Sequence, residues 1–354
     1  MGLTDIELGV LDGDGIGPEV VSAAAQVAEA ALEARGIAVR WRRLPIGHAA
    51  IAECGDPLPE STLEALAGLD GWLLGPHDNV SYPTQFAGRV APGGLIRKRF
   101  DLFANIRPAR SLGPATDRAL DLVIVRENTE GFYADRNMFA GSGEFMPTPD
   151  VAMAVGVFTR PAIERIAHEA FRTARDRGGR VTIAHKANVL AMTTGLFKRV
   201  CEEVGAQYPD VPVDGEHIDA LAALLVRRGH TFDVIVAENM FGDILSDLAG
   251  ELAGSIGAAP SLNASGTQAM AQAVHGAAPD IAGQGLANPT AMILSTALLL
   301  RWLGERRGPP ALTRAADDID SAVHATLQNG TRTRDLGGEA STEKFTRAVV
   351  ATLR

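Results

Sequence analysis

Several residue types and patterns that mark particular protein classes are scarce or missing in this chain. Its 354 residues include only two cysteines, Cys54 and Cys201, which excludes a disulfide framework and a cysteine-rich zinc site. Acidic residues exceed basic ones, and the net charge of −10 argues against a nucleic-acid partner. The longest apolar stretch, residues 291–300, is too short to cross a membrane. Because the chain starts without a basic leader and a long apolar segment, we expect no signal peptide and a cytoplasmic location.

The residues that are present describe a globular protein with alternating strands and helices. The length suits two domains of ordinary size. Apolar runs alternate with segments of helical spacing, which predicts a parallel sheet covered by helices on both faces. The expected strands are residues 6–11, 37–41, 70–74, 122–125, 181–184 and 232–237, and the expected helices are 59–66, 159–174, 220–228 and 290–303, with another from Val20.

Two carboxylates that follow the strand 232–237 form the most informative pattern. Gly242 is expected to let the chain turn, and the spacing of the next apolar residues starts a helix near Asp243. Asp243 and Asp247 then share one helix face, with Cβ atoms about 6 Å apart. Open α/β sheets place ligands at the carboxyl ends of strands, and paired carboxylates suit Mg²⁺ or Mn²⁺. A helix cap beside a solvated helix face would explain the same spacing without a metal.

Basic and proton-transferring residues accompany this acidic pair. Arg97, Arg107 and Arg126 are candidates for a pocket that binds carboxylates bidentately, although each would also suit an ordinary surface ion pair. Lys186 follows a strand and, with its pKa lowered at a site near carboxylates and a metal, would act as a base; a solvated lysine is the alternative. Asp219, just before the helix 220–228, offers a third acidic group.

Two glycine-containing segments bear on nucleotide binding. In residues 12–19 the glycines alternate, so no G-x-G-x-x-G fingerprint runs through them, and we expect a tight turn close to a ligand. Residues 275–290 form an irregular stretch that would cradle a nucleotide. Within it, Asp280 would accept hydrogen bonds from both ribose hydroxyls of NAD and repel the 2′-phosphate of NADP.

Six segments together resemble the β-decarboxylating 2-hydroxyacid dehydrogenases, the family of isopropylmalate, isocitrate, homoisocitrate and tartrate/D-malate dehydrogenases. The resemblance covers nearly the whole chain, and the segment 239–247 is its most specific part. The six segments are residues 13–19, 101–108, 126–131, 185–190, 239–247 and 275–289.

The resemblance implies an isopropylmalate-dehydrogenase-like α/β fold, with a large mixed sheet shared by two α/β domains, rather than a Rossmann fold. A nucleotide-binding large domain would comprise residues 1–103 and 253–354, and a small domain 104–252 would carry a dimer clasp at about 134–158. The implied homodimer has shared active sites: Lys186 and Asp219 cross to the partner's site, while Asp243 and Asp247 stay in their own.

The resemblance also implies roles for individual residues. Arg97, Arg107 and Arg126 would bind the substrate carboxylates, and Mg²⁺ or Mn²⁺ would lie between Asp219, Asp243 and Asp247. Lys186 would take the substrate's hydroxyl proton, and Tyr133, which would also suit a core tyrosine, would protonate the enolate carbon. NAD would contact Asn188, His275, Gly276, Asp280 and Asn288.

The substrate is the least determined part of this interpretation. In the family, the residues just before Arg97 contact the substituent at the third carbon, and residues 90–94 match none of its known patterns. Gly93 and Gly94 leave room, into which Arg89 or Tyr82 would reach. We therefore expect NAD-dependent oxidative decarboxylation of a 3-substituted D-malate, a small di- or tricarboxylate, with no nucleic acid or membrane involved. The alternatives are a tartrate/D-malate dehydrogenase, a catalytically silent regulatory subunit of the same fold and a plain nucleotide-binding module.

Overall fold

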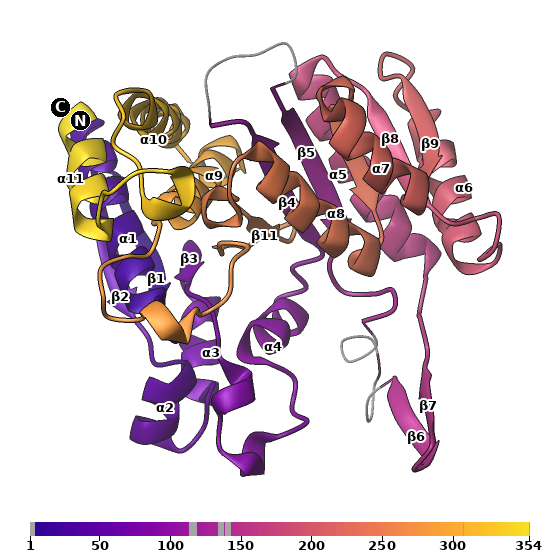
Figure 1. Cartoon of the computed structure of the whole chain (residues 1–354), viewed down its shortest axis with the longest axis horizontal. Helices are drawn as coiled ribbons and strands as arrows, with labels where there is room; N and C mark the ends of the chain where they lie inside the picture. The colour runs from indigo at the N-terminus through magenta and orange to yellow at the C-terminus, as the bar shows by residue number, and fades with distance from the viewer. Residues whose placement is uncertain (1–3, 113–118, 134–137, 139–142, 307, 354) are drawn as a thin grey trace.

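The computed structural model describes residues 4–112, 119–133, 138, 143–306 and 308–353, and a ten-stranded sheet runs through them (Figure 1). Its strand order is β2-β1-β3-β12-β11-β4-β5-β10-β8-β9. The strands are β1 (Thr4–Leu11), β2 (Ile37–Arg43), β3 (Gly71–Leu74), β4 (Ala104–Arg110), β5 (Asp121–Glu127), β8 (Val181–His185), β9 (Val213–His217), β10 (Val234–Ala237), β11 (Leu262–Ala264) and β12 (Ala269–Ala271).

The sheet is mixed, because its central strands reverse direction. β4 pairs antiparallel with both β5 and β11, and β11 pairs antiparallel with β12, whereas the outer pairs such as β1–β2 and β5–β10 are parallel. The expected α/β class with a large mixed sheet is therefore confirmed, and the expectation of an all-parallel sheet, drawn from alternation alone, is corrected. β11 and β12 are too short to stand out as apolar runs.

Helices cover both faces of the sheet. The helices are α1 (Gly17–Ala34), α2 (Gly47–Cys54), α3 (Glu60–Ala67), α4 (Pro92–Arg99), α5 (Arg160–Arg177), α6 (Thr193–Gly205), α7 (Ile218–Arg228), α8 (Asn239–Ala253), α9 (Thr290–Arg306), α10 (Pro310–Gln328) and α11 (Thr342–Thr352). α9 is buried along most of its length, since it packs against both α1 and α10. Figure 1 draws both ends of the chain in the same half of the molecule, beside these helices.

Separate apolar cores form from the two ends of the chain and from its middle. One core joins residues from both ends, including Leu32, Leu300 and Phe345. In the middle of the chain, alternate residues of each strand enter two cores, because successive side chains of a strand point to opposite faces. Val234 packs with α5 and α6, whereas its neighbour Ile235 packs with α7 and α8. The domain boundaries at residues 103 and 253 stay a prediction.

The start of α8 differs from the sequence expectation. The helix begins at Asn239, four residues before Asp243, because the Glu238 carboxylate caps it by accepting hydrogen bonds from the backbone N–H groups of Phe241 (2.8 Å) and Met240 (3.2 Å). Gly242 therefore lies inside the helix and forms no turn. The strand β9 was also not expected, since its sequence is polar and mostly exposed.

A two-stranded arm leaves the body of the protein between β5 and α5. It consists of β6 (Glu144–Thr148) and β7 (Val151–Ala154), and Figure 1 shows it projecting away from the rest of the chain. Large apolar side chains are exposed on it, among them Phe145, Met146 and Met153. The arm lies within the clasp expected at about 134–158, of which residues 134–137 and 139–142 fall outside the described residues. No helix in the described parts of the chain has the length and apolar character needed to cross a membrane.

Candidate active site

Three basic or hydroxyl side chains converge on the carboxylate of Asp243 in α8. Arg126 from β5 forms a short ion pair with Oδ1, and Nη1 of Arg107 from β4 lies 3.2 Å from the same oxygen. The hydroxyl of Tyr133 donates a hydrogen bond to Oδ2 at 2.8 Å. Asp247, one turn further along α8, lies 3.3 Å from Arg107 Nη1. The structure thus brings together five of the residues that the sequence nominated.

Three uncharged polar residues orient the two buried arginines, and sequence reasoning missed them. Arg107 donates to Asn105 Oδ1 at 2.6 Å and to Ser246 Oγ at 2.7 Å. Arg126 donates twice to Asn239 Oδ1, at 2.6 and 2.9 Å. Such fixed partners hold a guanidinium in one geometry before a ligand arrives. The available signal was spacing: Asn105 lies two residues before Arg107 on one face of β4, and Asn239 and Ser246 lie at helical spacing from Asp243 on α8.

Gly242 allows α8 to pack directly on Arg126. A Cβ atom at Gly242 would lie 2.7 Å from both Cβ and Cγ of Arg126, closer than real side chains approach each other. Glycine is therefore needed here because α8 approaches β5 closely, and not because the chain turns at this position, as the sequence suggested.

The charges within this cluster are coupled. Burial favours a higher pKa for Asp243, but Arg126 and Arg107 outweigh it, and the pKa falls below its usual value. Burial raises the pKa of Asp247, and Arg107 opposes that rise only partly. Asp243 is therefore the ionised partner of the two arginines, while Asp247, with about half of its side chain exposed, faces the solvent side of the cluster.

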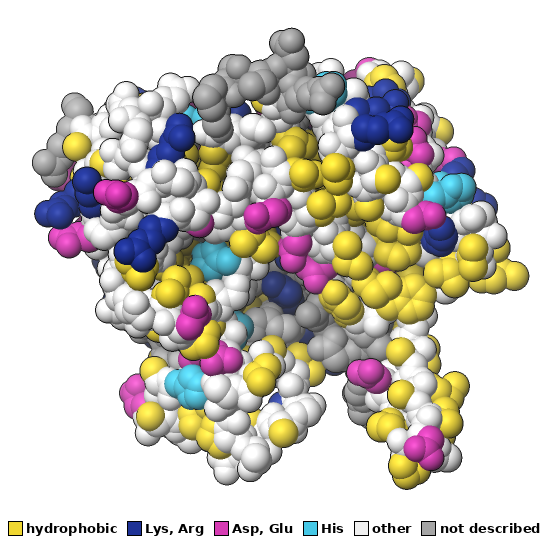
Figure 2. Space-filling view, viewed as in Figure 1, with side chains coloured by type: hydrophobic (Ala, Val, Ile, Leu, Met, Phe, Trp, Pro, Cys, Tyr) yellow, Lys and Arg dark blue, Asp and Glu magenta, His cyan; other side chains and the backbone are white. Residues whose placement is uncertain are grey.

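Arg97 on α4 lies near the same cluster from the other half of the molecule. Its Nη2 donates a hydrogen bond to Gln272 Oε1 at 2.8 Å. Its charge lowers the pKa of Asp243, so the guanidinium is within electrostatic range of the carboxylate. Figure 2 shows a hollow between the two halves of the molecule, with basic and histidine side chains on its floor.

Two residues expected to reach the substrate point elsewhere. The hydroxyl of Tyr82 donates to Asp14 at 2.6 Å, which ties the segment after β3 to the turn before α1. Arg89 lies 3.5 Å from Asp56, and more than half of its side chain is exposed. The idea that Arg89 or Tyr82 fills the space beside Gly93 is therefore wrong, because each already has an acidic partner.

Lys186 and Asp219 form a separate pair. Lys186 Nζ lies 2.6 Å from Asp219 Oδ1, and the Lys186 ammonium lowers the pKa of Asp219 through that hydrogen bond. Among the described residues no three acidic, histidine or cysteine side chains are placed to hold a metal, so one chain does not assemble the expected aspartate set. The donors nevertheless suit Mg²⁺ or Mn²⁺, since Asp243 and Asp247 share a helix face and the Asp219 carboxylate is two-thirds exposed.

The expected nucleotide segment borders a pocket of about 470 Å³. His275, Gly276 and Asn288 line it, and Asn288 is held by hydrogen bonds to Asp335 (2.8 Å) and from the Thr290 backbone (3.0 Å). Asp280 is exposed on the adjacent 3₁₀ turn Pro279–Ile281 and does not line the pocket. Asn188 is exposed in the turn after β8, away from these residues in the sequence.

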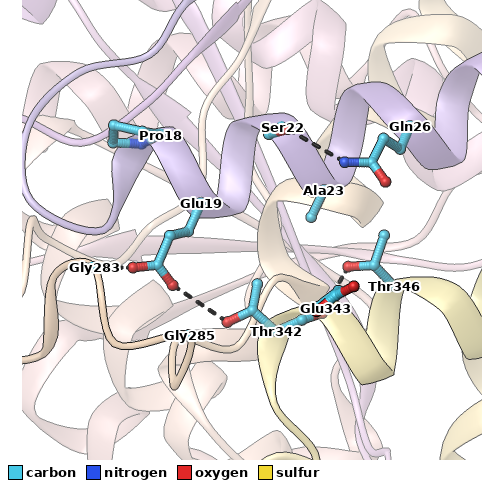
Figure 3. A pocket seen from close by; sticks show the side chains of 10 residues that line it. All are labelled: Pro18, Glu19, Ser22, Ala23, Gln26, Gly283, Gly285, Thr342, Glu343 and Thr346. Carbon is cyan, nitrogen blue, oxygen red and sulfur yellow. Dashed lines mark hydrogen bonds between the residues drawn. The ribbon is translucent and has the colours of Figure 1, made fainter.

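The glycine turn before α1 packs against the nucleotide segment. Gly15 has a positive φ of 59°, and a Cβ there would lie 2.0 Å from the carbonyl oxygen of Ala277. A second pocket, of about 430 Å³, lies between α1 and α11, and Gly283 and Gly285 of the nucleotide segment also line it (Figure 3). Glu19 on its wall accepts a hydrogen bond from the Gly283 backbone at 2.5 Å.

Comparisons with known proteins agree with this architecture. A family model described as isocitrate/isopropylmalate dehydrogenase matches residues 7–349. An isocitrate/homoisocitrate dehydrogenase of Thermus thermophilus is 43% identical over 352 residues, 98% of each chain. The 3-isopropylmalate dehydrogenase of Archaeoglobus fulgidus is 41% identical over 349 residues, 97% of this chain and 98% of the relative.

A solved structure shows the same fold. The crystal structure of isocitrate dehydrogenase from Methylococcus capsulatus matches with a TM-score of 0.86 at 37% identity, and the match covers 99% of each chain. The chain is thus an oxidoreductase, a decarboxylating dehydrogenase that belongs to the isocitrate/isopropylmalate dehydrogenase family.

Proposed function

We propose that the protein catalyses the NAD-dependent oxidative decarboxylation of a 3-substituted D-malate, with Mg²⁺ or Mn²⁺ as the metal. The observation that carries this proposal is the convergence of Arg107, Arg126 and Tyr133 on Asp243, within range of Arg97. Three guanidinium groups close to, or within electrostatic range of, one carboxylate suit a substrate with two or three carboxylates.

The residues of this chain have distinct tasks in that reaction. The arginines hold the substrate carboxylates and fix the geometry of the reacting carbons. Asp219, Asp243 and Asp247 would hold a divalent ion, which would supply Lewis-acid chemistry when bound, and NAD would supply the hydride acceptor. Lys186 takes the proton of the C2 hydroxyl. The Tyr133 hydroxyl, which Asp243 orients at 2.8 Å, donates its proton to the carbon that CO₂ leaves.

We also propose that the working protein is a homodimer with shared active sites. Lys186 and Asp219 pair with each other at an exposed position, separate from Asp243 and Asp247. The arm β6–β7 presents exposed apolar side chains, as an unpartnered interface does. In the dimer, the Lys186–Asp219 pair of one protomer would complete the acidic site of the other.

The pocket lined by His275 and Asn288 is proposed to hold the adenosine of NAD, with Asp280 on the adjacent turn favouring NAD over NADP. Arg334 also lines this pocket, so NADP belongs in the assay as a comparison. A cytoplasmic location stays part of the proposal.

A substrate panel tests the proposed function. The purified protein, supplied with Mg²⁺ or Mn²⁺, is assayed with isopropylmalate, isocitrate, homoisocitrate, D-malate and tartrate, and with NAD and NADP in parallel. We expect metal-dependent NADH formation together with CO₂ release from at least one 3-substituted malate. Turnover confined to D-malate or tartrate would favour the alternative activity, and a protein inactive on the whole panel would contradict the proposal.

A further inference from the structure

His77 occupies the space beside α4 that Gly93 leaves open. It follows β3 by three residues, and a Cβ atom at Gly93 would lie 3.1 Å from His77 Nε2. Both ring nitrogens of His77 are shielded from solvent, and neither has a hydrogen-bond partner among the described residues. An unsatisfied buried donor or acceptor destabilises a folded protein, so such a group calls for an explanation.

Gln272, the residue after β12, also lies close to Gly93. Its Nε2 would lie 3.6 Å from a Cβ at Gly93. Its Oε1 accepts the hydrogen bond from Arg97 Nη2 at 2.8 Å, which assigns the NH₂ group, a donor, to the side that faces Gly93. An imidazole and an amide donor therefore converge beside a residue without a side chain.

Arg97 connects this position to the substrate site. Its charge lowers the pKa of Asp243 and of His77, so the guanidinium lies within electrostatic range of both. Burial lowers the pKa of His77 to about 4, Asp14 opposes the shift, and Arg97 adds to it. At neutral pH the imidazole is uncharged and presents one N–H donor and one acceptor nitrogen.

We propose that His77, together with Gln272, recognises the substituent at the third carbon of the substrate and selects one that carries an oxygen. The inference rests on the proposed function and names its substrate class. A hydroxyl or carboxylate at this position accepts hydrogen bonds from the imidazole and the amide, whereas an alkyl group leaves both donors unpaired. Sites built to bind a polar group reject analogues that lack it far more strongly than apolar pockets reject a missing methylene.

The test compares substrates that differ at the third carbon. Isocitrate carries a carboxymethyl group there and homoisocitrate a carboxyethyl group, each ending in a carboxylate; tartrate carries a hydroxyl, isopropylmalate and 3-methylmalate carry alkyl groups, and D-malate carries no substituent. We expect kcat/KM of the wild-type protein to be at least about tenfold higher for an oxygen-bearing substrate than for either alkylmalate. The preference is expected for isocitrate or homoisocitrate, and turnover of tartrate alone would favour the tartrate/D-malate alternative and overturn this inference together with the proposed function.

Two His77 variants separate recognition from structure. His77→Leu should lower kcat/KM for the preferred substrate by about 10- to 100-fold and leave D-malate turnover within about twofold, whereas His77→Asn should retain more of the preference. NAD affinity and thermal stability are measured on each variant. If His77→Leu fails to fold, Gln272→Glu with the same panel decides, since it keeps an acceptor oxygen for Arg97 and removes the amide donor of the same position.

The possible failures are distinguishable. A wild-type preference for an alkylmalate, or an equal loss by His77→Leu on every substrate including D-malate, would overturn this inference while the proposed function stands. No turnover of any substrate would overturn the proposed function, and this inference with it.

Discussion

A single missing side chain, at Gly242, controls how closely α8 approaches Arg126. Gly242→Ala would place a methyl group 2.7 Å from two Arg126 carbons, in a region where Arg126 is almost fully buried and cannot move aside. We expect kcat/KM to fall by at least about tenfold and the free energy of unfolding to fall by about 1–3 kcal/mol. Steady-state kinetics and urea unfolding measure the two effects.

A matched control for that variant is Gly266→Ala, because no heavy atom lies within 4 Å of a Cβ at Gly266. It should behave as the wild type in both measurements. Equal behaviour of Gly242→Ala and Gly266→Ala would show that the close packing on Arg126 is unimportant.

Glu238, the cap of α8, should make stability depend on pH. Burial raises its pKa from an ordinary 4.5 to about 7, although the backbone N–H groups of Phe241 and Met240 oppose the shift. Between these values the folded chain holds a proton that the unfolded chain has released, so stability falls as pH rises from about 4.5 to about 7 and then levels off. The loss is on the order of 3 kcal/mol.

Glu238→Gln removes the titrating group and keeps one acceptor oxygen for the cap. The difference in unfolding free energy between pH 5 and pH 8 should therefore shrink by on the order of 3 kcal/mol, as measured by urea unfolding at the two pH values. Glu53→Gln, an exposed carboxylate on α2, serves as the control and should leave the pH profile unchanged. An unaltered profile in Glu238→Gln would contradict the assigned pKa.

Single residues also show where sequence reasoning succeeds and fails. Arg126 and Asp243 were nominated from their positions after apolar runs, Arg107 was nominated as an arginine suited to a carboxylate pocket, and the structure brings the three together. His77 was missed, because its significance lies in what it faces, Gly93 and Gln272, and no local pattern records a contact between such distant segments. Tyr82 and Arg89 were nominated from proximity in sequence, but Asp14 and Asp56 engage them.

At the scale of elements, strong apolar periodicity predicted most of the sheet and helices. β1, β8 and β10 lie where buried apolar runs indicated them. Elements without such a signal were missed: β9 is polar, and β11 and β12 have three residues each. The start of α8 was predicted four residues too late, because the helix is capped by Glu238 and not by the Ser, Thr, Asp or Asn that usually marks a helix start.

Glu19 joins α1 to the segment that borders the proposed nucleotide pocket. Its Oε1 accepts from the Gly283 backbone at 2.5 Å, and its Oε2 lies 3.5 Å from the hydroxyl of Thr342 on α11 (Figure 3). Glu19→Ala should raise KM for NAD by about 3- to 10-fold, since one charge-assisted hydrogen bond to a loop is lost, and leave kcat within about twofold.

Two further variants test whether a change in KM comes from the hydrogen bond between Glu19 and Gly283. Glu19→Gln retains an acceptor for Gly283 and should stay close to the wild type, and Glu343→Ala, on the same pocket wall, should leave KM for NAD unchanged. Initial-rate kinetics with NAD and substrate varied separately give the split. A fall in kcat with constant KM for NAD would mean that Glu19 does not act through the nucleotide segment.

At the scale of the whole molecule, the residues proposed for one active site lie in two separate places in the chain. Asp243 and Asp247 lie in the arginine cluster, whereas Lys186 and Asp219 pair with each other elsewhere. The sequence offers no direct measure of this separation, because spacing along the chain does not reveal which protomer a side chain serves. The expectation that Lys186 and Asp219 reach the partner's active site came from the resemblance to the family. The exposed side chain of Asp219 is compatible with that expectation.

Complementation between inactive variants tests the shared site most directly. Lys186→Met and Asp247→Asn are each purified with different affinity tags and combined, and the mixed dimer is isolated and assayed. If Lys186 and Asp219 serve the partner's site, one site of the mixed dimer receives only intact residues, and about half of the wild-type rate per dimer returns. A mixed dimer of Lys186→Met with Asp219→Asn is the control and should stay inactive, because both changes affect residues that cross. Absence of activity in the Lys186→Met/Asp247→Asn dimer would contradict the account.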